Sequence, residues 1–203
     1  MLLAATFAGA ADSRPASGKA GSAEVRRGGT LRINIPGGDV DHINPSLAYG
    51  TSSWAIEYST ALKLLNYPDA TAPRGSRLVP EGASRYAISR DGKTYTFTIR
   101  KGFRFSNGRV VTAANYAYAI NRALDKDLQS PAFQFVSDPS GTNIVGAQAV
   151  RDGRASSAAG VRVRGNKLIV RLTKADPTFL AKISMPFFQA IPTSLARTRR
   201  SST

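Results

Sequence analysis

Hydrophobic and polar residues alternate in several stretches of the chain, and this alternation predicts β-strands. A first strand is predicted over residues 30–35. Residues 85–89 and 93–100 form a predicted hairpin, in which Asp91-Gly92 supplies the positive φ values of a tight primed turn. The core-facing positions of its second strand are Tyr95, Phe97 and Ile99, and Phe103 and Phe105 continue the same apolar face.

Two further strand signals lie in the C-terminal half. Residues 161–173 alternate around Gly165-Asn166, a pair typical of a tight turn, and form a second predicted hairpin. Residues 187–191 are predicted to form one more strand.

Helical spacing of apolar residues predicts helices between these strands. Residues 54–65 place Trp54, Tyr58, Leu62 and Leu65 on one face, which we expect to be buried. Thr112 is a suitable N-cap for a helix that runs to about Leu124. Residues 143–158 are alanine-rich and partly helical, and a short helix is expected over 176–184. Strands and helices mixed in this order indicate an α/β or α+β fold (mixed α+β).

The amino-acid composition excludes several classes of functional site. Among 203 residues, 42% are hydrophobic and 20% charged, which is typical of a globular chain and not of a disordered one. The absence of cysteine excludes disulfides, thiolate zinc sites, iron–sulfur clusters and a cysteine nucleophile, and a single histidine disfavours catalytic triads. No metal site and no cofactor are expected. We therefore predict that the protein is not an enzyme.

The net charge of +15 is concentrated in one part of the chain. Residues 1–80 carry eight basic and six acidic side chains, a net of +2, whereas residues 81–203 carry twenty basic and seven acidic ones, a net of +13. Such asymmetry raises a nucleic acid or another anion as an alternative partner. The basic residues at 162, 164, 167 and 171 alternate with apolar ones, which is equally typical of the solvated face of a half-buried sheet.

Two motifs that suggest chemistry are rejected. Gly92-Lys93-Thr94 imitates the end of a P-loop, but Ala87 stands where that loop needs glycine, and a strand follows instead of a helix. Asp39, Asp41 and His42 are too few ligands for a metal site and are typical of a solvated loop.

The two ends differ from the middle. Residues 1–27 begin with a short apolar stretch and small residues, as at the end of a secretory signal, and continue as a polar, flexible leader. No cysteine is present for a lipoprotein anchor. Residues 196–203 are polar and basic and are expected to be a disordered tail, whereas residues 28–195 carry the predicted elements.

Three blocks in this middle part resemble the family 5 extracellular solute-binding proteins, which serve ABC importers of oligopeptides, dipeptides and nickel. The first combines Gly28-Gly29-Thr30-Leu31 with Ile43-Asn44-Pro45. The second and most specific runs from Leu78 through Asp91-Gly92-Lys93-Thr94-Tyr95-Thr96-Phe97 to Val111-Thr112-Ala113. The third includes Ile144 to Ala149 and Asp176-Pro177. The chain departs from the family pattern at Asn44, where the family has Asp, at Val110, where it usually has Pro, and at Ala114-Asn115, where it has an acidic pair.

The resemblance implies a partial class II periplasmic-binding-protein-like fold. The chain would contain the first part of lobe one and its inserted subdomain, and lobe two would be missing, as in an N-terminal fragment. The implied function is the peptide-binding component of an ABC importer, located in the periplasm or outside the cell. The implied partners are a peptide or similar small solute and the ABC permease subunits, and the chain is expected to be a monomer that does not bind nucleic acid.

The resemblance also implies ligand contacts. Tyr49, Gly50 and Thr51 align with the segment that lends backbone groups to an extended peptide, although this loop could instead pack against the neighbouring helix. Phe133 is a candidate aromatic contact, with a core position as the alternative. Trp54 is expected in the core. A small basic nucleic-acid- or anion-binding protein, or an inert fragment, remains the alternative function.

Overall fold

The computed structural model describes residues 28–30, 32, 34, 40–138, 141 and 143–196. The chain divides into two units, residues 1–34 and residues 35–203, and the fold described below belongs to the second. The strand predicted over 30–35 and the leader and tail segments 1–27 and 197–203 lie outside the described residues, apart from Thr30, Arg32 and Asn34.

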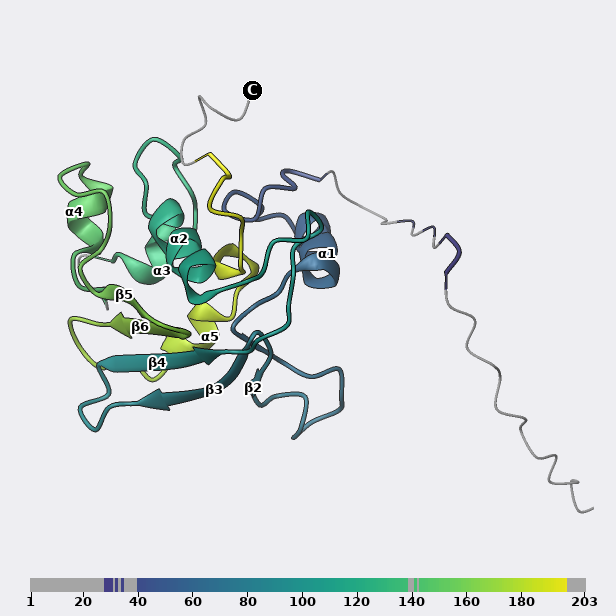
Figure 1. Cartoon of the computed structure of the whole chain (residues 1–203), viewed down its shortest axis with the longest axis horizontal. Helices are drawn as coiled ribbons and strands as arrows, with labels where there is room; N and C mark the ends of the chain where they lie inside the picture. The colour runs from purple at the N-terminus through teal and green to yellow at the C-terminus, as the bar shows by residue number, and fades with distance from the viewer. Residues whose placement is uncertain are drawn as a thin grey trace, which may run out of the picture. The chain divides into compact units, whose positions relative to one another are not determined.

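Helices and strands are mixed along the chain, as predicted (Figure 1). The helices are α1 (Thr51–Thr60), α2 (Ala113–Ala123), α3 (Phe133–Val136), α4 (Ala147–Arg151), α5 (Phe179–Ile183) and the 3-10 helix η1 (Pro186–Phe188). The strands are β1 (Leu65–Asn66), β2 (Val79–Pro80), β3 (Ala83–Ile88), β4 (Thr94–Ile99), β5 (Val161–Arg164) and β6 (Lys167–Arg171). Among the described residues, no helix is both long enough and apolar enough to cross a bilayer.

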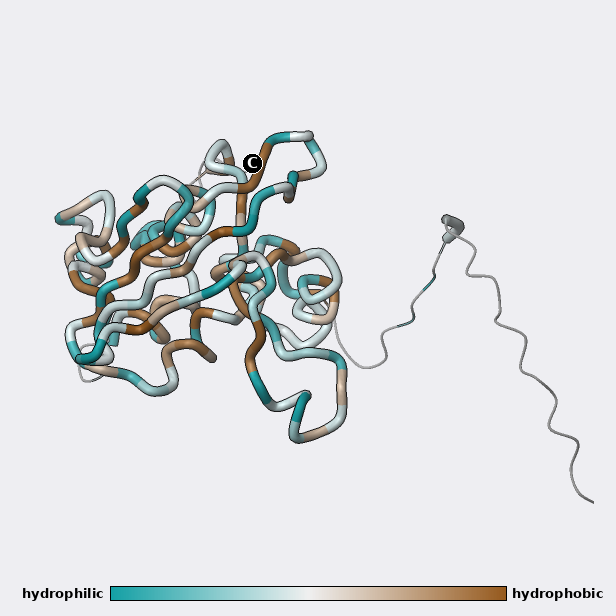
Figure 2. The backbone as a smooth tube through the Cα atoms, turned by 60° about the horizontal axis from the view of Figure 1, so that its bottom comes forward, coloured by the Kyte–Doolittle hydropathy of each residue, from teal (hydrophilic) through white to brown (hydrophobic). Residues whose placement is uncertain are grey.

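The two predicted hairpins join into one antiparallel sheet with the order β3-β4-β6-β5. The second strand of each hairpin lies in the centre, where Phe97 of β4 is opposite Leu168 of β6. Tyr95, Phe97 and Ile99 are buried and the threonines between them are partly exposed, which confirms the predicted alternation. Figure 2 colours the backbone by hydropathy and shows hydrophobic and hydrophilic stretches interspersed along the chain. Beside this sheet, β1 and β2 form a short antiparallel pair.

The first hairpin turns differently from the prediction. In this turn only Gly92 has a positive φ, +67°, whereas a type I′ turn with Asp91-Gly92 at its centre requires positive φ at both residues. The Gly92 N–H donates to the Ser89 carbonyl at 2.9 Å, and Asp91 stays in the normal region of φ. Gly92 is the last residue of this turn, and its positive φ is a conformation that glycine adopts without steric cost.

Helix α2 begins at the predicted cap. The Asn115 amide oxygen accepts the backbone N–H of Thr112 at 2.9 Å, which satisfies a group at the start of the helix. The Asn115 amide nitrogen donates to the Ile191 carbonyl, also at 2.9 Å. An ionised carboxylate, as in the acidic pair of the family pattern, has no proton to donate to Ile191. Asparagine at this position therefore links α2 to the segment after η1.

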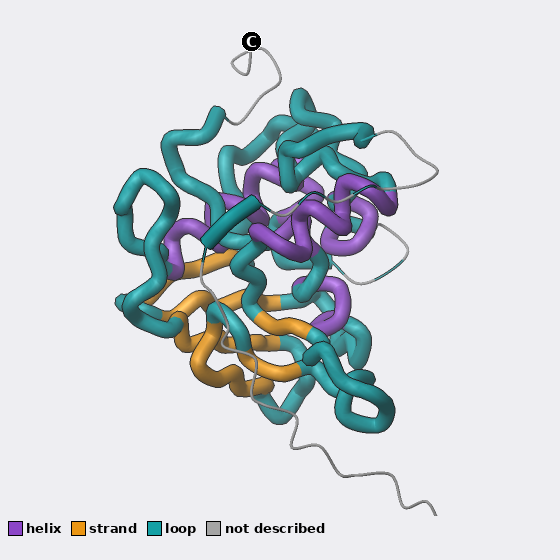
Figure 3. Tube along the Cα trace, turned by 90° about the vertical axis from the view of Figure 1, so that its right-hand side faces the viewer, coloured by secondary structure: helices purple, strands orange, loops and turns teal. Residues whose placement is uncertain are grey.

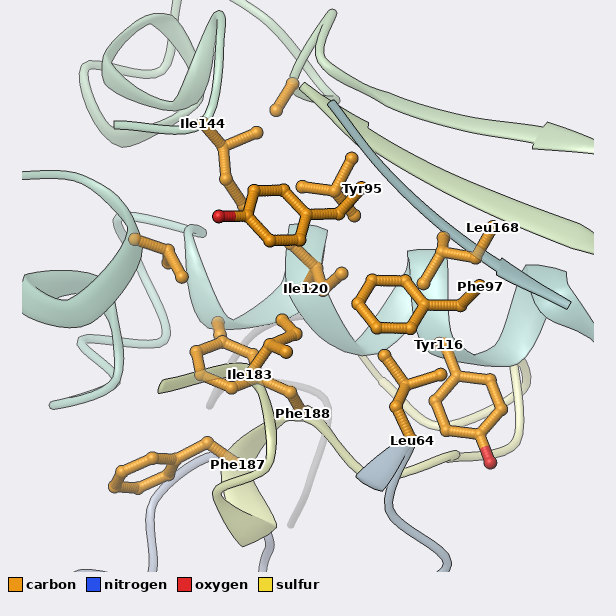
Figure 4. Close-up of a cluster of buried hydrophobic side chains, with 14 of the residues drawn as sticks. Leu64, Tyr95, Phe97, Tyr116, Ile120, Ile144, Leu168, Ile183, Phe187 and Phe188 are labelled. Atoms are coloured by element: carbon orange, nitrogen blue, oxygen red, sulfur yellow. The ribbon is translucent and has the colours of Figure 1, made fainter. Parts of the chain in front are cut away.

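The core lies between α2 and one face of the four-stranded sheet, and the helices gather on that side of it (Figure 3). Figure 4 shows buried side chains from the sheet, from α2 and from the segment 183–188 packed together. Tyr116 and Ile120 of α2 are fully buried, as the spacing predicted. The other face of the sheet carries the polar and charged side chains of β5 and β6.

Besides this turn, three local predictions were wrong. The predicted helix over 54–65 runs instead from Thr51 to Thr60, and Leu65 lies in β1. Its buried residues are Ser52, Ser53 and Glu57, whereas Tyr58 is 47% exposed. Because the helix ends at Thr60, Leu62 and Leu65 do not lie on it, and the predicted buried stripe does not form.

The other two errors come from glycine and proline. Phe103 does not continue the apolar face and is 37% exposed, because Gly102, at φ +100°, changes the chain direction after β4. Residues 187–191 are described and do not form the predicted strand. A 3-10 helix begins at Pro186 instead. Proline lacks the N–H that a strand ladder needs.

Candidate ligand-binding surface at the start of helix α1

The segment that carries Tyr49, Gly50 and Thr51 is held in place by the carboxylate of Asp41. Asp41 Oδ2 accepts the backbone N–H of Tyr49 at 2.8 Å and that of Gly50 at 2.9 Å. Asp41 Oδ1 accepts the His42 N–H at 2.8 Å and the hydroxyl of Ser53. The Ser53 hydroxyl and these backbone donors hold the pKa of Asp41 well below its usual range, so the carboxylate is ionised.

Asp41 also places a negative charge at the N-terminus of α1, where no acidic residue lies in the first turn and the N-cap residue is Gly50. A Cβ at position 50 would lie 3.2 Å from Asp41 Oδ1, so a side chain there would crowd the carboxylate. The sequence indicated Asp41 only as part of a solvated loop. Asp41 and Ser53 are twelve residues apart, and no sequence pattern indicated that Asp41 would hold the start of α1.

The turn before this segment is connected to α2 by Asn44. Asn44 Oδ1 accepts a hydrogen bond from Nη1 of Arg122 at 2.8 Å and another from the Ser46 N–H at 3.2 Å. Arg122 is fully buried, and its Nε also donates to the Ala196 carbonyl at 2.6 Å. Nη2 of Arg122 is buried without a partner in the described part of the chain. A buried cation is thus paired with a neutral amide at the position where the family pattern has Asp.

Four aromatic residues meet beside this segment and form what we call the aromatic cluster: Tyr49, Trp54, Phe135 and Phe187. Phe187 is fully buried in the middle, with the Tyr49 ring stacked at 5.9 Å and the Phe135 ring stacked at 6.1 Å between centroids. Trp54 contacts Phe187 edge-on at 5.4 Å, and its Nε1 donates to the Ala48 carbonyl at 2.8 Å. Tyr49 is 53% exposed. The cluster therefore presents an aromatic ring to solvent on a buried aromatic base.

The structure places Phe133 apart from the ring contacts of this cluster. Its ring is half-buried, and the Arg151 guanidinium of α4 lies 3.8 Å from its centroid. Phe135, two residues later, is the aromatic that contacts Phe187. The buried Ser130 hydroxyl donates to the Ser46 carbonyl and so fixes this segment against the loop before Tyr49. The resemblance indicated Phe133 and gave no role to Phe135.

The backbone groups of the segment are only partly available. The N–H groups of Tyr49 and Gly50 bind Asp41, and the Gly50 carbonyl accepts the Trp54 N–H at 3.0 Å as the first bond of α1. In the part of the chain that the structure describes, the Tyr49 carbonyl and the Thr51 N–H have no hydrogen-bond partner. One acceptor and one donor are the groups that an extended ligand backbone requires.

A buried carboxyl lies on the inner side of α1. Glu57 is 4% exposed and accepts a hydrogen bond from Nε2 of the buried Gln189. Desolvation raises the pKa of Glu57, and the hydrogen bond from Gln189 opposes this shift. The charged form of Glu57 is therefore less favourable in the folded state than in water.

Glu57→Gln is expected to stabilise the protein at neutral pH relative to the natural chain. The folded-state pKa of Glu57 lies above its ordinary 4.5, so the folded state holds a proton that the unfolded state has released. The stability of the natural chain should therefore fall, relative to the variant, as pH rises from 4.5 through the raised pKa, and the difference should then stay constant. Urea unfolding of both chains between about pH 4 and 8 measures it. A difference in stability that does not change with pH would contradict the assignment to Glu57.

The described residues contain no cluster of histidine and carboxylates suited to a metal ion. Asp41 is engaged by backbone and hydroxyl donors and Asp39 lies outside the described residues, so the sequence motif around His42 forms no metal site that the structure describes.

Comparison with known proteins is consistent with this geometry. The model of the bacterial extracellular solute-binding proteins, family 5, matches residues 77–201. The oligopeptide-binding protein OppA of Bacillus subtilis (strain 168) is 36% identical over 154 residues, covering 74% of this chain and 26% of that protein. The chain thus spans about a quarter of the length of the curated relatives it matches.

Solved structures agree with the fold. The substrate-binding domain of an oligopeptide ABC transporter from Bacillus anthracis str. Ames has a TM-score of 0.64 at 29% identity, covering 74% of this chain and 27% of that one. The murein tripeptide binding protein MppA of Escherichia coli has a TM-score of 0.64 at 26% identity, and the match covers 75% of this chain and 29% of that one. The mixed α/β fold is therefore that of part of a substrate-binding protein.

Proposed function

Because this chain belongs to the bacterial extracellular solute-binding proteins, family 5, we propose that it is part of the peptide-binding component of an ABC importer. Residues 28–195 then form the first part of lobe one with its inserted subdomain, and the ligand would be enclosed by a second lobe. The protein would act outside the cytoplasmic membrane as a monomer, without catalysis, and deliver peptide to permease subunits.

The observation that carries this proposal is the exposed ring of Tyr49 on the aromatic cluster, beside two backbone groups that have no hydrogen-bond partner among the described residues. The Tyr49 carbonyl and the Thr51 N–H can pair with any peptide backbone, since such pairing does not depend on the ligand's side chains. The Tyr49 ring, 53% exposed, offers apolar contact to a ligand side chain. Asp41 fixes Tyr49 and Gly50 before the ligand arrives, which lowers the entropic cost of binding.

Peptide titration of the isotope-labelled chain tests the proposal by NMR. Tri-alanine and penta-alanine should shift the backbone amides of residues 41–58, with Thr51 among the largest. Affinity should be weak, with a Kd on the order of 1 mM, because one wall of the site is present. Tyr49→Ala should weaken binding about tenfold, while Tyr67→Ala, which removes an exposed tyrosine outside the cluster, should not.

Shifts spread evenly over the chain, or equal losses in the two tyrosine variants, would contradict the proposed surface. Phe133 stays in the proposal as a separate candidate contact. Phe133→Leu should reduce affinity if a bound peptide replaces Arg151 over the ring, and Phe135→Leu provides the comparison within the cluster.

A further inference from the structure

The outer face of the four-stranded sheet carries basic and neutral side chains only. In an antiparallel pair, residues directly opposite each other project from the same face. Arg164 is opposite Lys167, and Arg171 is opposite Thr94 of β4. Continuing this register gives the set that we call the basic sheet face: Arg85, Arg162, Arg164, Lys167 and Arg171. None of the four strands contains an acidic residue.

These five cations are exposed, and no acidic side chain in the described part of the chain forms an ion pair with them. The ion pairs of the described residues join Arg154 to Asp152 and Lys182 to Asp176, and neither includes a member of the basic sheet face. Arg162, Arg164 and Arg171 line a shallow cavity of about 300 Å³ together with Ile169. Arg162 is oriented by a hydrogen bond from its Nε to the Ala159 carbonyl at 3.2 Å. The basic sheet face therefore combines the oriented guanidinium of Arg162 with cations that form no ion pair among the described residues.

Placing Arg164 directly opposite Lys167 is unfavourable in the isolated sheet, because like charges on opposed strands repel. A partner rich in phosphate would remove this repulsion, and the planar guanidinium fork matches phosphate oxygens in pairs. The strands lie about 4.8 Å apart, so the charges are spread over an area about 15 Å wide. Such a surface fits a planar array of anions better than a single small anion.

The same face is poorly suited to nucleic acid. None of its outward positions is aromatic, whereas single strands are bound by stacking bases on aromatic rings. The strands present no projecting helix for a duplex groove, since the helices lie on the opposite side of the sheet (Figure 3). A lipid bilayer presents phosphate headgroups in a plane and attracts each basic residue that reaches it.

We propose that the basic sheet face binds the anionic lipid headgroups of a bilayer surface. The contact is peripheral and electrostatic, and it leaves the aromatic cluster on the helical side of the sheet free. Charged side chains on the edge strands β3 and β5 also discourage pairing with other chains, a role that needs no lipid. The experiment must separate these two roles.

Co-sedimentation of the full chain with vesicles of phosphatidylglycerol and phosphatidylcholine tests the proposal, with phosphatidylcholine alone as the reference. The natural chain should bind the anionic vesicles at low salt and be released at about 0.5 M salt. A variant with Arg162, Arg164, Lys167 and Arg171 each changed to Gln should bind at least about 100-fold more weakly, since each basic residue near the surface contributes about fivefold. The matched control changes Arg74, Arg77, Arg109 and Lys126 to Gln, which removes the same charge outside the four strands and should change binding about twofold or less.

Equal losses in the two variants would show that net charge alone drives binding and would overturn the proposal. So would the absence of vesicle binding, or a labelled DNA duplex that competes more strongly than vesicles at equal phosphate. Aggregation of the first variant with unchanged vesicle affinity would assign the charges to protection of the sheet edges instead. If that variant does not fold, as judged by Trp54 fluorescence, Arg162→Gln with Arg164→Gln should still weaken binding about tenfold or more.

Discussion

Phe187→Ala should lower the free energy of unfolding by about 3–5 kcal/mol, among the largest effects of any single truncation in this chain. Phe187 is fully buried and contacts the rings of Tyr49, Trp54, Phe135 and Phe188, so its removal leaves a cavity lined by aromatic groups that cannot close it. Denaturant unfolding measures the loss. Trp54 is the one tryptophan of the chain, and its emission should shift to longer wavelength as water reaches the cluster.

Phe103→Ala is the matched control, since Phe103 is 37% exposed and its truncation should cost less than about 1 kcal/mol. If Phe187→Ala prevents folding, Phe187→Leu should retain the fold with a loss of about 1–2 kcal/mol. Similar losses in Phe187→Ala and Phe103→Ala would mean that the aromatic cluster does not support the fold. In the folded Phe187→Leu variant, the Tyr49 ring should also be less fixed, and peptide affinity should fall with it.

Arg122→Ala should lower the free energy of unfolding by about 3–5 kcal/mol, because it opens a cavity where a fully buried side chain stood and removes the donor to two partly buried acceptors. The acceptors are Oδ1 of Asn44 and the carbonyl of Ala196. Desolvation also lowers the pKa of Arg122, although the guanidinium stays charged at any pH of interest. Denaturant unfolding again gives the magnitude.

Replacing Asn44, which accepts a hydrogen bond from Arg122, by aspartate should stabilise the protein. Asn44→Asp keeps both acceptor bonds and gives Arg122 a carboxylate, so the free energy of unfolding should rise by about 1–2 kcal/mol. In the Arg122→Ala background the carboxylate that this substitution introduces has no cation to pair with and should stabilise nothing. A gain that is independent of Arg122 would show that the two side chains are not coupled.

Local sequence determined most of the regular structure. The two hairpins, the inward set of β4 and the buried stripe of α2 were predicted because each depends on neighbours within a few residues. Gly102 and Pro186 explain the errors at Phe103 and over residues 187–191, whereas the wrong start of the first helix has a cause far away in the sequence. Helix α1 begins at Thr51 because Asp41 organises its N-terminus, and no spacing rule relates residues 41 and 51.

The candidate site was predictable only in part. The resemblance indicated Tyr49, Gly50 and Thr51, and the structure places them together at the start of α1. It did not indicate Asp41, Phe135 or Phe187. Asp41 looked like a solvated loop residue, Phe135 was given no role because Phe133 was the aromatic nominated there, and Phe187 was predicted to lie in a strand.

The sequence by itself therefore determined the family, the mixed α/β class and the alternation that makes one face of the sheet basic, because these follow from residue order and short-range periodicity. The tertiary structure decided which side chains act together. Phe187 meets Tyr49 across more than a hundred residues of chain, and the register of β5 on β6 sets Arg164 opposite Lys167. Such pairings depend on how the elements pack in three dimensions, and sequence periodicity contains no information about distances between separate elements.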